Sequence, residues 1–473
     1  MFKQYINGQL VDGKGKVMKV YNPATDEIID TVGCADKEQT EEALNAAKEA
    51  FKIWSKVTVN ERADWLLKLR DACKAEYDTL VDLVMAESGR PYDAACGDVN
   101  WFLISMQYYG DEAKRINGEV LTSPIKGQYH IVTKEPIGVT VGHLAWNYPL
   151  GNASIKLGPA VASGCTCIIK PSSETPLATL YIGVIAEKIG FPKGVINIIA
   201  GPSGEVAKAL NESKIPSMIS CIGSYETGLK ILEQSATSLK RYSLELGGNA
   251  PVVVMPDADL DQTAANIVAK KVGFAGQTCV NYNRIYIHES IYDVMCQKIA
   301  DELSKVKLGC GKDKGYIMGP VINKQARDRM LELIDDAVKN GATLIMGGDV
   351  PDKFAKGSFI TPALLKDVND DMRVSKEEIF GPIIPLQSFK TLEEAIEKSN
   401  NTIFGLSAYF FGHNAKEISE YTANVDAGEI FVNGGIGSEF TPHPGHKQSG
   451  LGCDKSKWSL EEYYELKLLS INP

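Results

Sequence analysis

One cysteine stands in a setting that favours nucleophilic chemistry. Cys279 ends the segment Gly276-Gln277-Thr278-Cys279, whose small residues would let other groups approach the sulfur closely. Because the thiolate is the attacking form, such a site must favour the anion. Taken alone, a single cysteine is more often a buried apolar residue than a nucleophile.

Two polar residues could assist such a nucleophile. Glu245 stands among apolar residues just before two glycines, and a buried carboxylate binds protons more readily and can act as a general base. A paired structural charge would look the same in the sequence. Asn147 follows a predicted strand, and its amide could donate to an oxyanion, although an asparagine in such a turn is otherwise ordinary loop chemistry.

The signals for a nucleotide are weaker. The sequence has no Gly-x-Gly-x-x-Gly motif, and the nearest feature is Gly223-Ser224 at a predicted strand-to-helix turn, where free N–H groups could bind a phosphate. The Lys-Ser/Thr of a P-loop is absent, which argues against ATP. Lys170 follows another predicted strand and could reach a ribose or a phosphate, or it could be a solvated surface lysine.

The elements that must position these residues alternate between strand and helix. Strands are expected at 137–144, 164–170, 194–200, 217–222, 242–246, 252–255, 285–288 and 342–346, and helices at 176–189, 204–210 and 226–234. This alternation predicts parallel sheets covered by helices, with ligands bound outside the carboxyl ends of the strands.

Other segments flank this pattern. Helices are expected at 36–54, capped by Asp36, and at 60–87, ended by Gly89. Residues 118–135 alternate and predict a hairpin, while 460–471 predicts a strand or extended tail with no obvious partner. Because unpaired strands attract other chains, we expect an oligomer.

Composition excludes several classes of function. The net charge of −10 argues against nucleic acid as a partner. No run of 18 apolar residues exists to span a membrane, and the first residues resemble neither a signal nor a transit peptide, so a cytoplasmic location is expected. The ten cysteines lack paired metal-ligand spacing, which favours reduced thiols and no metal.

Taken together, the motifs resemble those of the aldehyde dehydrogenase superfamily over nearly the whole chain. The matches follow the family's order and spacing: Trp146-Asn147-Tyr148-Pro149, Lys170-Pro171, Gly223-Ser224, Glu245-Leu246-Gly247-Gly248, Gly276-Gln277-Thr278-Cys279, Glu378-Ile379-Phe380-Gly381-Pro382 and Lys447-Gln448-Ser449-Gly450. Any one match could arise by chance, but the series is highly specific. The resemblance implies an enzyme that uses NAD or NADP to oxidise an aldehyde to a carboxylic acid.

The resemblance also implies a role for each matched residue. Cys279 would attack the carbonyl carbon, Asn147 and the main-chain N–H of Cys279 would hold the oxyanion, and Glu245 would activate the water that hydrolyses the thioester. Glu378 would hold the nicotinamide ribose, with Phe380 beside the ring. The full set of implied cofactor contacts is Trp146, Lys170, Ser173, Gly223, Ser224, Glu378 and Phe380.

The implied fold is α/β, with two doubly wound domains and a β-hairpin oligomerisation element. A Rossmann-like cofactor domain would comprise residues 1–117 and 137–247, and a catalytic domain residues 248–440. The oligomerisation element would comprise 118–136 and 455–473, in a homodimer or a homotetramer.

Departures from the family pattern bear on specificity. NAD-preferring members usually carry Glu three residues after the lysine, where this chain has Ser173. A serine does not repel a 2′-phosphate, so we expect NADP to be accepted alongside NAD or in preference to it, with the neighbouring Glu174 as the opposing charge. Members specific for succinate semialdehyde or lactaldehyde carry Arg eight residues after the catalytic Asn, where this chain has Ile155. His443-Pro444-Gly445-His446 departs from the usual Phe-Gly-Gly.

By resemblance, the substrate tunnel is lined by Tyr148, Asn152, Ile155, Thr278, Val280 and part of 434–441, including Ser438. Its polar groups would penalise a purely apolar chain, since they would lose water without gaining a partner. We therefore expect a short aldehyde with hydroxyl or acidic groups, such as lactaldehyde, succinate semialdehyde, or a sulfonated or phosphonated analogue. His443 or His446 could supply positive charge if either faces the tunnel.

Two other functions fit the sequence less well. CoA-acylating relatives lack the Glu that activates water, whereas this chain has Glu245. A non-catalytic structural relative would be expected to lose its nucleophile, whereas Cys279, Asn147, Glu245 and Glu378 are all present.

Overall fold

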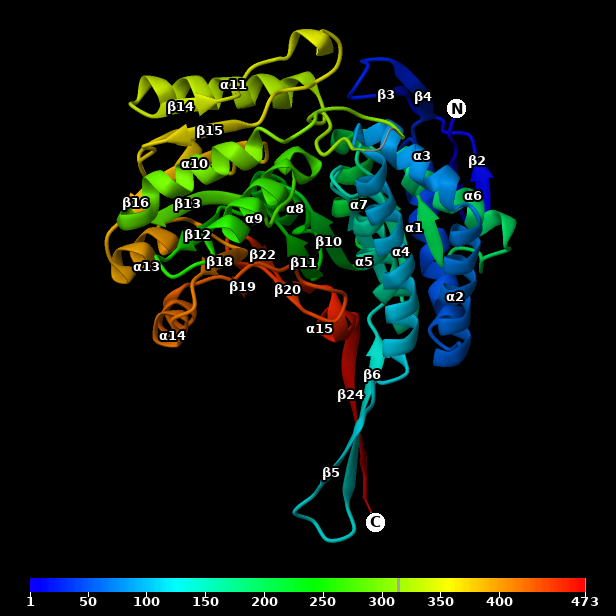
Figure 1. Cartoon of the computed structure of the whole chain (residues 1–473). Coiled ribbons are helices and arrows are strands. Elements are labelled where there is room, and N and C mark those ends of the chain that lie inside the picture. Colours follow the sequence, from blue (N-terminus) through cyan, green and yellow to red (C-terminus); the bar gives the residue numbers. More distant parts are fainter. Residues whose placement is uncertain (313–314, 473) are drawn as a thin grey trace.

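The computed structural model describes residues 1–312 and 315–472, and it places two large helix-covered sheets side by side with an arm projecting from them (Figure 1). The helices α1 to α6 stand on one side of the molecule and α9 to α14 on the other. The arm carries the C-terminal strand to its far end. Both large sheets are flanked by helices, so the predicted α/β class is confirmed.

The first sheet has eight strands, of which the five central ones run parallel. In spatial order they are β2 (Gln9–Val11), β1 (Gln4–Ile6), β9 (Ile196–Ile198), β8 (Thr166–Lys170), β7 (Val139–His143), β10 (Pro216–Ile222), β11 (Arg241–Glu245) and β22 (Gly450–Leu451). The helices of this half are α1 (Lys37–Trp54), α2 (Val59–Ala75), α3 (Tyr77–Ser88), α4 (Tyr92–Ala113), α5 (Pro149–Ser163), α6 (Leu177–Lys188), α7 (Lys208–Glu212) and α8 (Tyr225–Ser235).

The second sheet has seven strands and lies beside the first. In spatial order they are β14 (Thr343–Met346), β15 (Ala363–Lys366), β16 (Ile383–Phe389), β13 (Tyr282–His288), β12 (Ala250–Val254), β18 (Ser407–Phe411) and β19 (Glu429–Val432). Only β14 pairs antiparallel with its neighbour. Its helices are α9 (Leu260–Val272), α10 (Tyr292–Leu303), α11 (Lys324–Lys339), α12 (Arg373–Lys376), α13 (Leu392–Asn400) and α14 (Ala415–Asn424).

Alternate side chains of the central strands pack into apolar clusters on opposite faces. Cys167 and Ile169 of β8 join one cluster and Ile168 joins another. In β12, Val252 and Val254 face one cluster, while Val253 faces a second. Burial on both faces explains why these strands are continuous apolar runs in the sequence.

Three pairs of short strands lie outside these sheets. They are β3 (Val17–Tyr21) with β4 (Ile28–Gly33), β17 (Phe404–Gly405) with β21 (His446–Lys447), and β20 (His443–Pro444) with β23 (Cys453–Asp454). The pairing of β20 with β23 brings His443 opposite Asp454.

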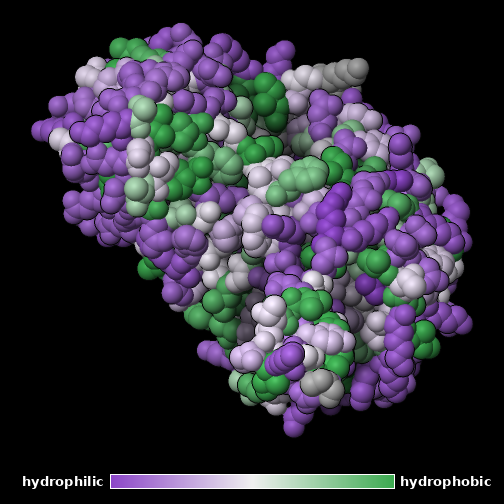
Figure 2. All heavy atoms as spheres, turned by 90° about the horizontal axis from the view of Figure 1, so that it is seen from below, coloured by the Kyte–Doolittle hydropathy of each residue, from purple (hydrophilic) through white to green (hydrophobic). Residues whose placement is uncertain are grey.

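The arm is a three-stranded antiparallel sheet of β5 (Glu119–Thr122), β6 (Tyr129–Pro136) and β24 (Tyr464–Ile471). It carries exposed apolar side chains, among them Val120, Leu121, Leu466, Leu468 and Leu469. Figure 2 views the molecule from below, the side from which the arm extends, and shows green hydrophobic residues among purple hydrophilic ones.

Several predicted elements are confirmed and others are corrected. Asp36 caps α1, and Gly89 ends α3 in the left-handed conformation, as predicted. The single helix expected at 60–87 is wrong, because the backbone breaks at Glu76 between α2 and α3. The helix expected at 204–210 is a π-helical turn followed by α7.

The C-terminal tail also differs from the expectation. Its first residues belong to the short helix α15 (Ser456–Glu462), and the strand begins only at Tyr464. That strand is not unpaired, since it pairs with β6 along its whole length. The partner lies more than 300 positions earlier in the chain, which is why local pattern could not reveal it. Within the described part of the chain, no helix is long and apolar enough to cross a membrane.

Candidate active site

A cavity of about 1060 Å³ opens at the carboxyl ends of β7, β8, β10 and β11. This is where a parallel sheet is expected to bind a ligand. All three predicted catalytic residues line it, as do all seven predicted cofactor contacts: Cys279, Glu245, Asn147, Trp146, Lys170, Ser173, Gly223, Ser224, Glu378 and Phe380. The fold therefore brings together residues separated by up to 234 positions in the sequence, from Trp146 to Phe380.

The loop before Cys279 has an unusual backbone. Phe274 and Ala275 adopt positive φ angles of 48° and 51°, and Gly276 follows at 73°. A Cβ added to Gly276 would lie 2.4 Å from the carbonyl oxygen of Gly381. Because two left-handed non-glycine residues are rare, this strained turn indicates a backbone held for function. At Gly276 the loop that precedes Cys279 packs directly against the loop that carries Glu378 and Phe380.

Cys279 has two ionisable neighbours in the interior. Its Sγ lies 3.9 Å from Nε2 of His443, and that nitrogen lies 3.4 Å from Oε1 of Glu245. The other ring nitrogen of His443, Nδ1, lies 3.0 Å from Oε2 of Glu429. The His443, Glu245 and Glu429 side chains are all at most 9% exposed.

These contacts set the charge balance of the site. Burial, together with the charge of Glu245, raises the pKa of the Cys279 thiol to about 12, while His443 acts in the opposite direction. Burial lowers the pKa of His443, but its contacts with Cys279, Glu245 and Glu429 outweigh burial and hold the pKa well above its ordinary value. His443 therefore favours its protonated form and places a positive charge beside the sulfur.

The sequence predicted that His443 would supply positive charge only if it faced the substrate tunnel. Its position where the family usually has Phe was the one available signal, and its contact with Cys279 spans 164 positions. His446, named with it, is exposed and lies 2.9 Å from Asp426. Only one of the two histidines therefore contacts the catalytic cysteine.

Asn147 is held from three directions. Its amide donates to the carbonyl of Gln277 at 3.2 Å, and its Oδ1 accepts from the amide of Asn152 at 3.2 Å. The guanidinium of Arg90, which is fully buried, donates to its main-chain carbonyl. Sequence reasoning missed Arg90, because nothing near it in the sequence indicates a partner 57 residues away.

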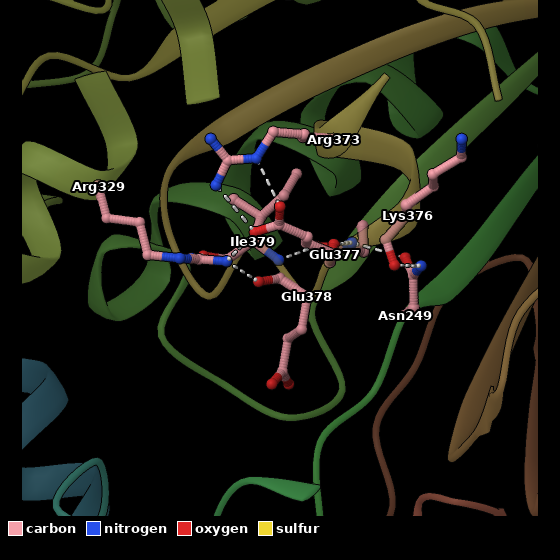
Figure 3. Close-up of polar contacts among 8 residues, drawn as sticks. Asn249, Arg329, Arg373, Lys376, Glu377, Glu378 and Ile379 are labelled. Atoms are coloured by element: carbon pink, nitrogen blue, oxygen red, sulfur yellow. Dashed lines mark hydrogen bonds and ion pairs between the residues drawn. The ribbon is translucent and has the colours of Figure 1, made fainter. Parts of the chain in front are cut away.

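Glu378 projects from a loop that is clamped through its main chain. Arg329 donates to the carbonyls of Glu378 and Ile379 at 2.9 and 2.8 Å and also contacts Glu377, which Arg373 holds from the other side. In Figure 3 the Glu378 side chain points away from both arginines. Its carboxylate accepts from the N–H of Gly248 at 2.9 Å. Burial raises the pKa of Glu378 to about 7.

The remaining cofactor candidates lie along the same cavity. Lys170 is almost completely buried, and burial lowers its pKa to about 8. Ser224 caps α8 by accepting from the N–H of Thr227, so the start of that helix faces the cavity beside Gly223. The ring of Trp146 packs edge-on against Phe380, with centroids 5.3 Å apart.

None of the six substrate candidates lines this cavity, although Asn152 contacts Asn147, and Thr278 and Val280 flank Cys279. Tyr148 packs edge-on against Trp101, and Ile155 is buried within α5. Both amide protons of Asn152 are used, one by Asn147 and one by the carbonyl of Ala145. The Thr278 hydroxyl is buried without a hydrogen-bond partner, the Val280 carbonyl accepts from Tyr409, and the Ser438 hydroxyl accepts from the N–H of Phe440.

The site also has the donor set of a metal centre. One ligand atom each from Glu245, Cys279 and His443 lies within 4.8 Å of the other two. Sequence spacing showed no sign of this, because the three residues come from separate elements. Thiolate, imidazole and carboxylate are ligands that Zn²⁺ accepts, so experiments on this site must control the metal content of the buffer.

Comparison with known proteins places the chain in a family. The model of the aldehyde dehydrogenase family matches residues 10–469. A glutarate-semialdehyde dehydrogenase from Pseudomonas putida is 38% identical over 100% of this chain and 98% of that protein. An NADP(+) succinate-semialdehyde dehydrogenase from Escherichia coli is 36% identical over 100% and 98%.

A solved structure agrees with these matches. A crystal structure described as an E. coli NADP-dependent enzyme superposes with a TM-score of 0.97 at 36% identity, covering 100% of this chain and 98% of that one. The chain therefore belongs to the aldehyde dehydrogenase family, and its activity is the NAD(P)-dependent oxidation of an aldehyde.

Proposed function

We propose that this chain oxidises a short acidic or hydroxylated aldehyde to its carboxylic acid, with Cys279 as nucleophile. The Sγ attacks the carbonyl carbon, and the amide of Asn147 with the main-chain N–H of Cys279 holds the oxyanion. Glu378 and Phe380 would hold the nicotinamide end of NAD(P)+, which would supply the acceptor for the hydride released as the oxyanion collapses. Glu245 then takes a proton from the water that hydrolyses the thioester. The observation that carries this proposal is the convergence of Cys279, Glu245 and Asn147 on one cavity.

The lining of the cavity supports the use of NADP. Ser173 replaces the expected carboxylate and lies on the same wall as Lys170. A serine can donate to a 2′-phosphate, and a lysine adds positive charge. Glu174 lines the same cavity and is exposed, so its negative charge opposes NADP.

Two lysines that sequence reasoning missed support an acidic substrate. Lys455 Nζ lies 5.0 Å from the ring centroid of Trp101, which packs on the substrate candidate Tyr148. Lys270 Nζ lies 5.6 Å from the ring of Tyr409, whose hydroxyl contacts the Val280 carbonyl.

Each of these two lysines acts on the catalytic centre through its charge. Burial lowers the pKa of Lys270, and the charges of Cys279 and Glu429 oppose that shift. The charge of Lys455 acts against protonation of His443. Among the residues the structure describes, neither lysine has a carboxylate within 4.0 Å. Lys455 and Lys270 would supply the positive charge that Arg provides in the succinate-semialdehyde and lactaldehyde members and that Ile155 does not provide. The semialdehyde names of the two relatives agree with an anionic substrate.

A panel of aldehydes tests this proposal. We expect kcat/KM for succinate semialdehyde and lactaldehyde to exceed that for hexanal and benzaldehyde by at least about tenfold, or about 1.4 kcal/mol of transition-state preference. Lys455→Met and Lys270→Met should lower kcat/KM for succinate semialdehyde and leave hexanal nearly unchanged. A tenfold lead for hexanal or benzaldehyde would contradict the proposal.

The same assay, run with each cofactor and with CoA, tests the choice of nucleotide and the fate of the thioester. We expect NADP to support turnover, and Ser173→Glu to shift the preference toward NAD; a wild-type enzyme that ignores NADP would overturn the argument from Ser173. Adding CoA should leave the rate unchanged, because Glu245 is placed for hydrolysis. A rate that depends on CoA would indicate acyl transfer instead.

We also propose the division of the molecule into working parts. Residues 1–117 and 137–247 form the cofactor domain, 248–440 the catalytic domain, and 118–136 with 455–473 the oligomerisation element of a homodimer or homotetramer. What supports this division is the distribution of strands between two sheets and the exposed apolar residues of the arm. A cytoplasmic location stays a prediction.

A further inference from the structure

Three side chains of different chemistry converge in the interior of the site. The Sγ of Cys279 lies 3.9 Å from Nε2 of His443, and that nitrogen lies 3.4 Å from Oε1 of Glu245. One ligand atom from each residue lies within 4.8 Å of the other two. The residues come from the loop before β13, from β20 and from the end of β11. The fold therefore gathers a thiol, an imidazole and a carboxylate around one point.

The spacing of these atoms suits a tetrahedral zinc ion. Zn²⁺ binds sulfur at ~2.3 Å and nitrogen or oxygen at ~2.0 Å, so tetrahedral ligand atoms lie roughly 3.3–3.6 Å apart. Nε2 of His443 and Oε1 of Glu245 already have that spacing, at 3.4 Å. The sulfur of Cys279 would have to approach them by no more than roughly 1.3 Å. Three protein ligands leave the fourth position of the ion to water.

Two buried polar atoms of this cluster make no hydrogen bond within the described part of the chain. One is Oε1 of Glu245, and the other is Nδ1 of His443, on the far side of the ring from the sulfur. Buried polar atoms are seldom left unpaired, and a bound ion is one of the groups that can satisfy them. Nδ1 lies 3.0 Å from Oε2 of Glu429. A carboxylate beside the ring nitrogen that does not bind the metal is the usual support of a zinc-bound histidine.

A divalent cation also balances the charge of this cluster. A thiolate at Cys279, together with Glu245 and Glu429, would bring three negative charges into a buried region, which is costly without a compensating cation. Zn²⁺ displaces one proton from the sulfur and one from the imidazole, so two positive charges replace two others and the net charge is unchanged. Lys270 and Lys455 act on the same groups through their charge and oppose the ion.

We propose that Cys279, His443 and Glu245 form a binding site for Zn²⁺, and that occupation of this site reversibly inhibits the enzyme. The ion enters through the cavity, which Cys279 and Glu245 line. Once bound, it occupies both the sulfur that attacks the aldehyde and the carboxylate that activates water. Zn²⁺ is therefore an inhibitor here rather than a cofactor, and a chelator restores activity. The binding site does not depend on the proposed function, whereas the inhibition rests on it.

Metal binding can be measured without a substrate. The probes are Zn²⁺ and Co²⁺, added to protein that has been treated with EDTA and then freed of the chelator. Calorimetric titration gives the Kd and the stoichiometry for Zn²⁺, and the absorption spectrum of the Co²⁺ form shows whether a thiolate binds the metal. The variants are His443→Phe, which introduces the residue usual in the family, and Glu429→Gln. The matched control is His446→Gln, an exposed histidine that lies 2.9 Å from Asp426.

In the wild type we expect one tightly bound Zn²⁺ per chain, a sulfur-to-metal charge-transfer band with Co²⁺, and protection of Cys279 from iodoacetamide while zinc is bound. Loss of an outer partner of a metal ligand typically costs ~10–100-fold in affinity, so Glu429→Gln should raise the Kd within that range and His443→Phe by more. His446→Gln should bind zinc as the wild type does. An unchanged Kd in His443→Phe, or a Co²⁺ spectrum without the sulfur band, would overturn the proposal.

Two further measurements keep the test decisive. The melting temperature of each variant shows whether it has folded; if His443→Phe has not, Cys279→Ser takes its place and should lose both the charge-transfer band and the tight site. Turnover with and without Zn²⁺ separates the site from its effect. Zinc that binds to these residues without slowing turnover would refute the inhibition, and with it the proposed role of Cys279. Zinc that does not bind, in an enzyme that Cys279→Ala inactivates, would refute the metal site and leave the proposed function intact.

Discussion

At the scale of single residues, the two buried carboxylates Glu245 and Glu378 are proposed to act at different steps. Glu245 lies within reach of Cys279 through His443, whereas Glu378 sits on the opposite loop and accepts from Gly248. Both are buried and line the same cavity, and the main chain of Glu378 is held by Arg329. Substitutions at these residues should therefore fail at different steps.

Cys279→Ala should abolish turnover and leave cofactor binding nearly intact. The nucleophile is lost, while a thiol adds little to the affinity for a nucleotide. Absorbance at 340 nm measures the first effect, and calorimetric titration with NADP measures the second. Residual oxidation above a few per cent of the wild-type rate would show that another group attacks the aldehyde.

Glu245→Gln should slow the enzyme at a later step. The nucleophile is still present, so acylation and hydride transfer should occur, and stopped-flow absorbance should record a burst of reduced cofactor followed by slow turnover. A variant with no burst would mean that Glu245 also acts before hydride transfer, for example on the thiol itself.

The raised pKa of Glu378 predicts that cofactor binding depends on pH. Its pKa is raised to about 7 by burial, so the carboxylate becomes protonated as the pH falls through that value. A neutral carboxyl accepts hydrogen bonds from a ribose less strongly, so the Kd for the cofactor should rise below pH 7. Glu378→Gln should bind weakly at all pH values and lose this dependence. A wild-type Kd that is flat between pH 6 and 8 would contradict the assignment.

At the scale of elements, buried charges join pieces that are distant in the sequence. Lys156 on α5 meets Asp454 on β23 at 2.6 Å, and both side chains are at most 2% exposed. The helix α5 begins just after Asn147, and β23 pairs with the strand that carries His443. This ion pair therefore connects the helix that follows Asn147 to the strand pair that carries His443.

Removing one partner of this pair should destabilise the fold strongly. Lys156→Met leaves the charge of Asp454 buried without compensation, which typically costs about 3–5 kcal/mol. The double variant Lys156→Met/Asp454→Leu should recover most of that loss, because two apolar side chains need no partner. Denaturant unfolding of the three proteins measures both effects. Equal stability of the single and double variants would show that the unpaired charge is solvated.

At the scale of the whole molecule, the arm is the part that its own chain leaves most exposed. Its sheet has three strands, and one face presents Leu121, Leu466 and Leu468, each more than 40% exposed. Exposed apolar residues on a projecting sheet with open edges are characteristic of an interface. Within the chain, β24 pairs with one edge of β6. Association with another chain would therefore use the faces of the sheet and its outer edges, which are β24 and β5.

Charging this face should lower the oligomeric state. We expect Leu466→Asp/Leu468→Asp to sediment as a smaller species than the wild type, because burying two carboxylates in an apolar interface is costly. Glu135→Gln, which removes one exposed ion-pair partner on the same arm, serves as the control and should sediment as the wild type does. A wild-type protein that sediments as a monomer would refute the assigned role of the arm.

The sequence by itself determined the family, the alternation of strands and helices, and the types of residue that carry the chemistry. These are local properties: a run of β-branched residues forms a buried strand, Asp36 caps the helix it precedes, and Gly89 supplies the left-handed end of another. Motifs such as Gly276-Gln277-Thr278-Cys279 are likewise contiguous. They could be read without knowing what lies across the fold.

Only the tertiary structure decided which residues meet. The contacts of His443 with Cys279 and Glu245, of Arg90 with Asn147, and of β24 with β6 join segments 57 or more positions apart. The same holds for the two lysines near the substrate candidates. No local pattern encodes such pairs, because each contact depends on the packing of two sheets and the elements between them. The electrostatic surroundings of Cys279 are therefore a property of the fold rather than of its motif.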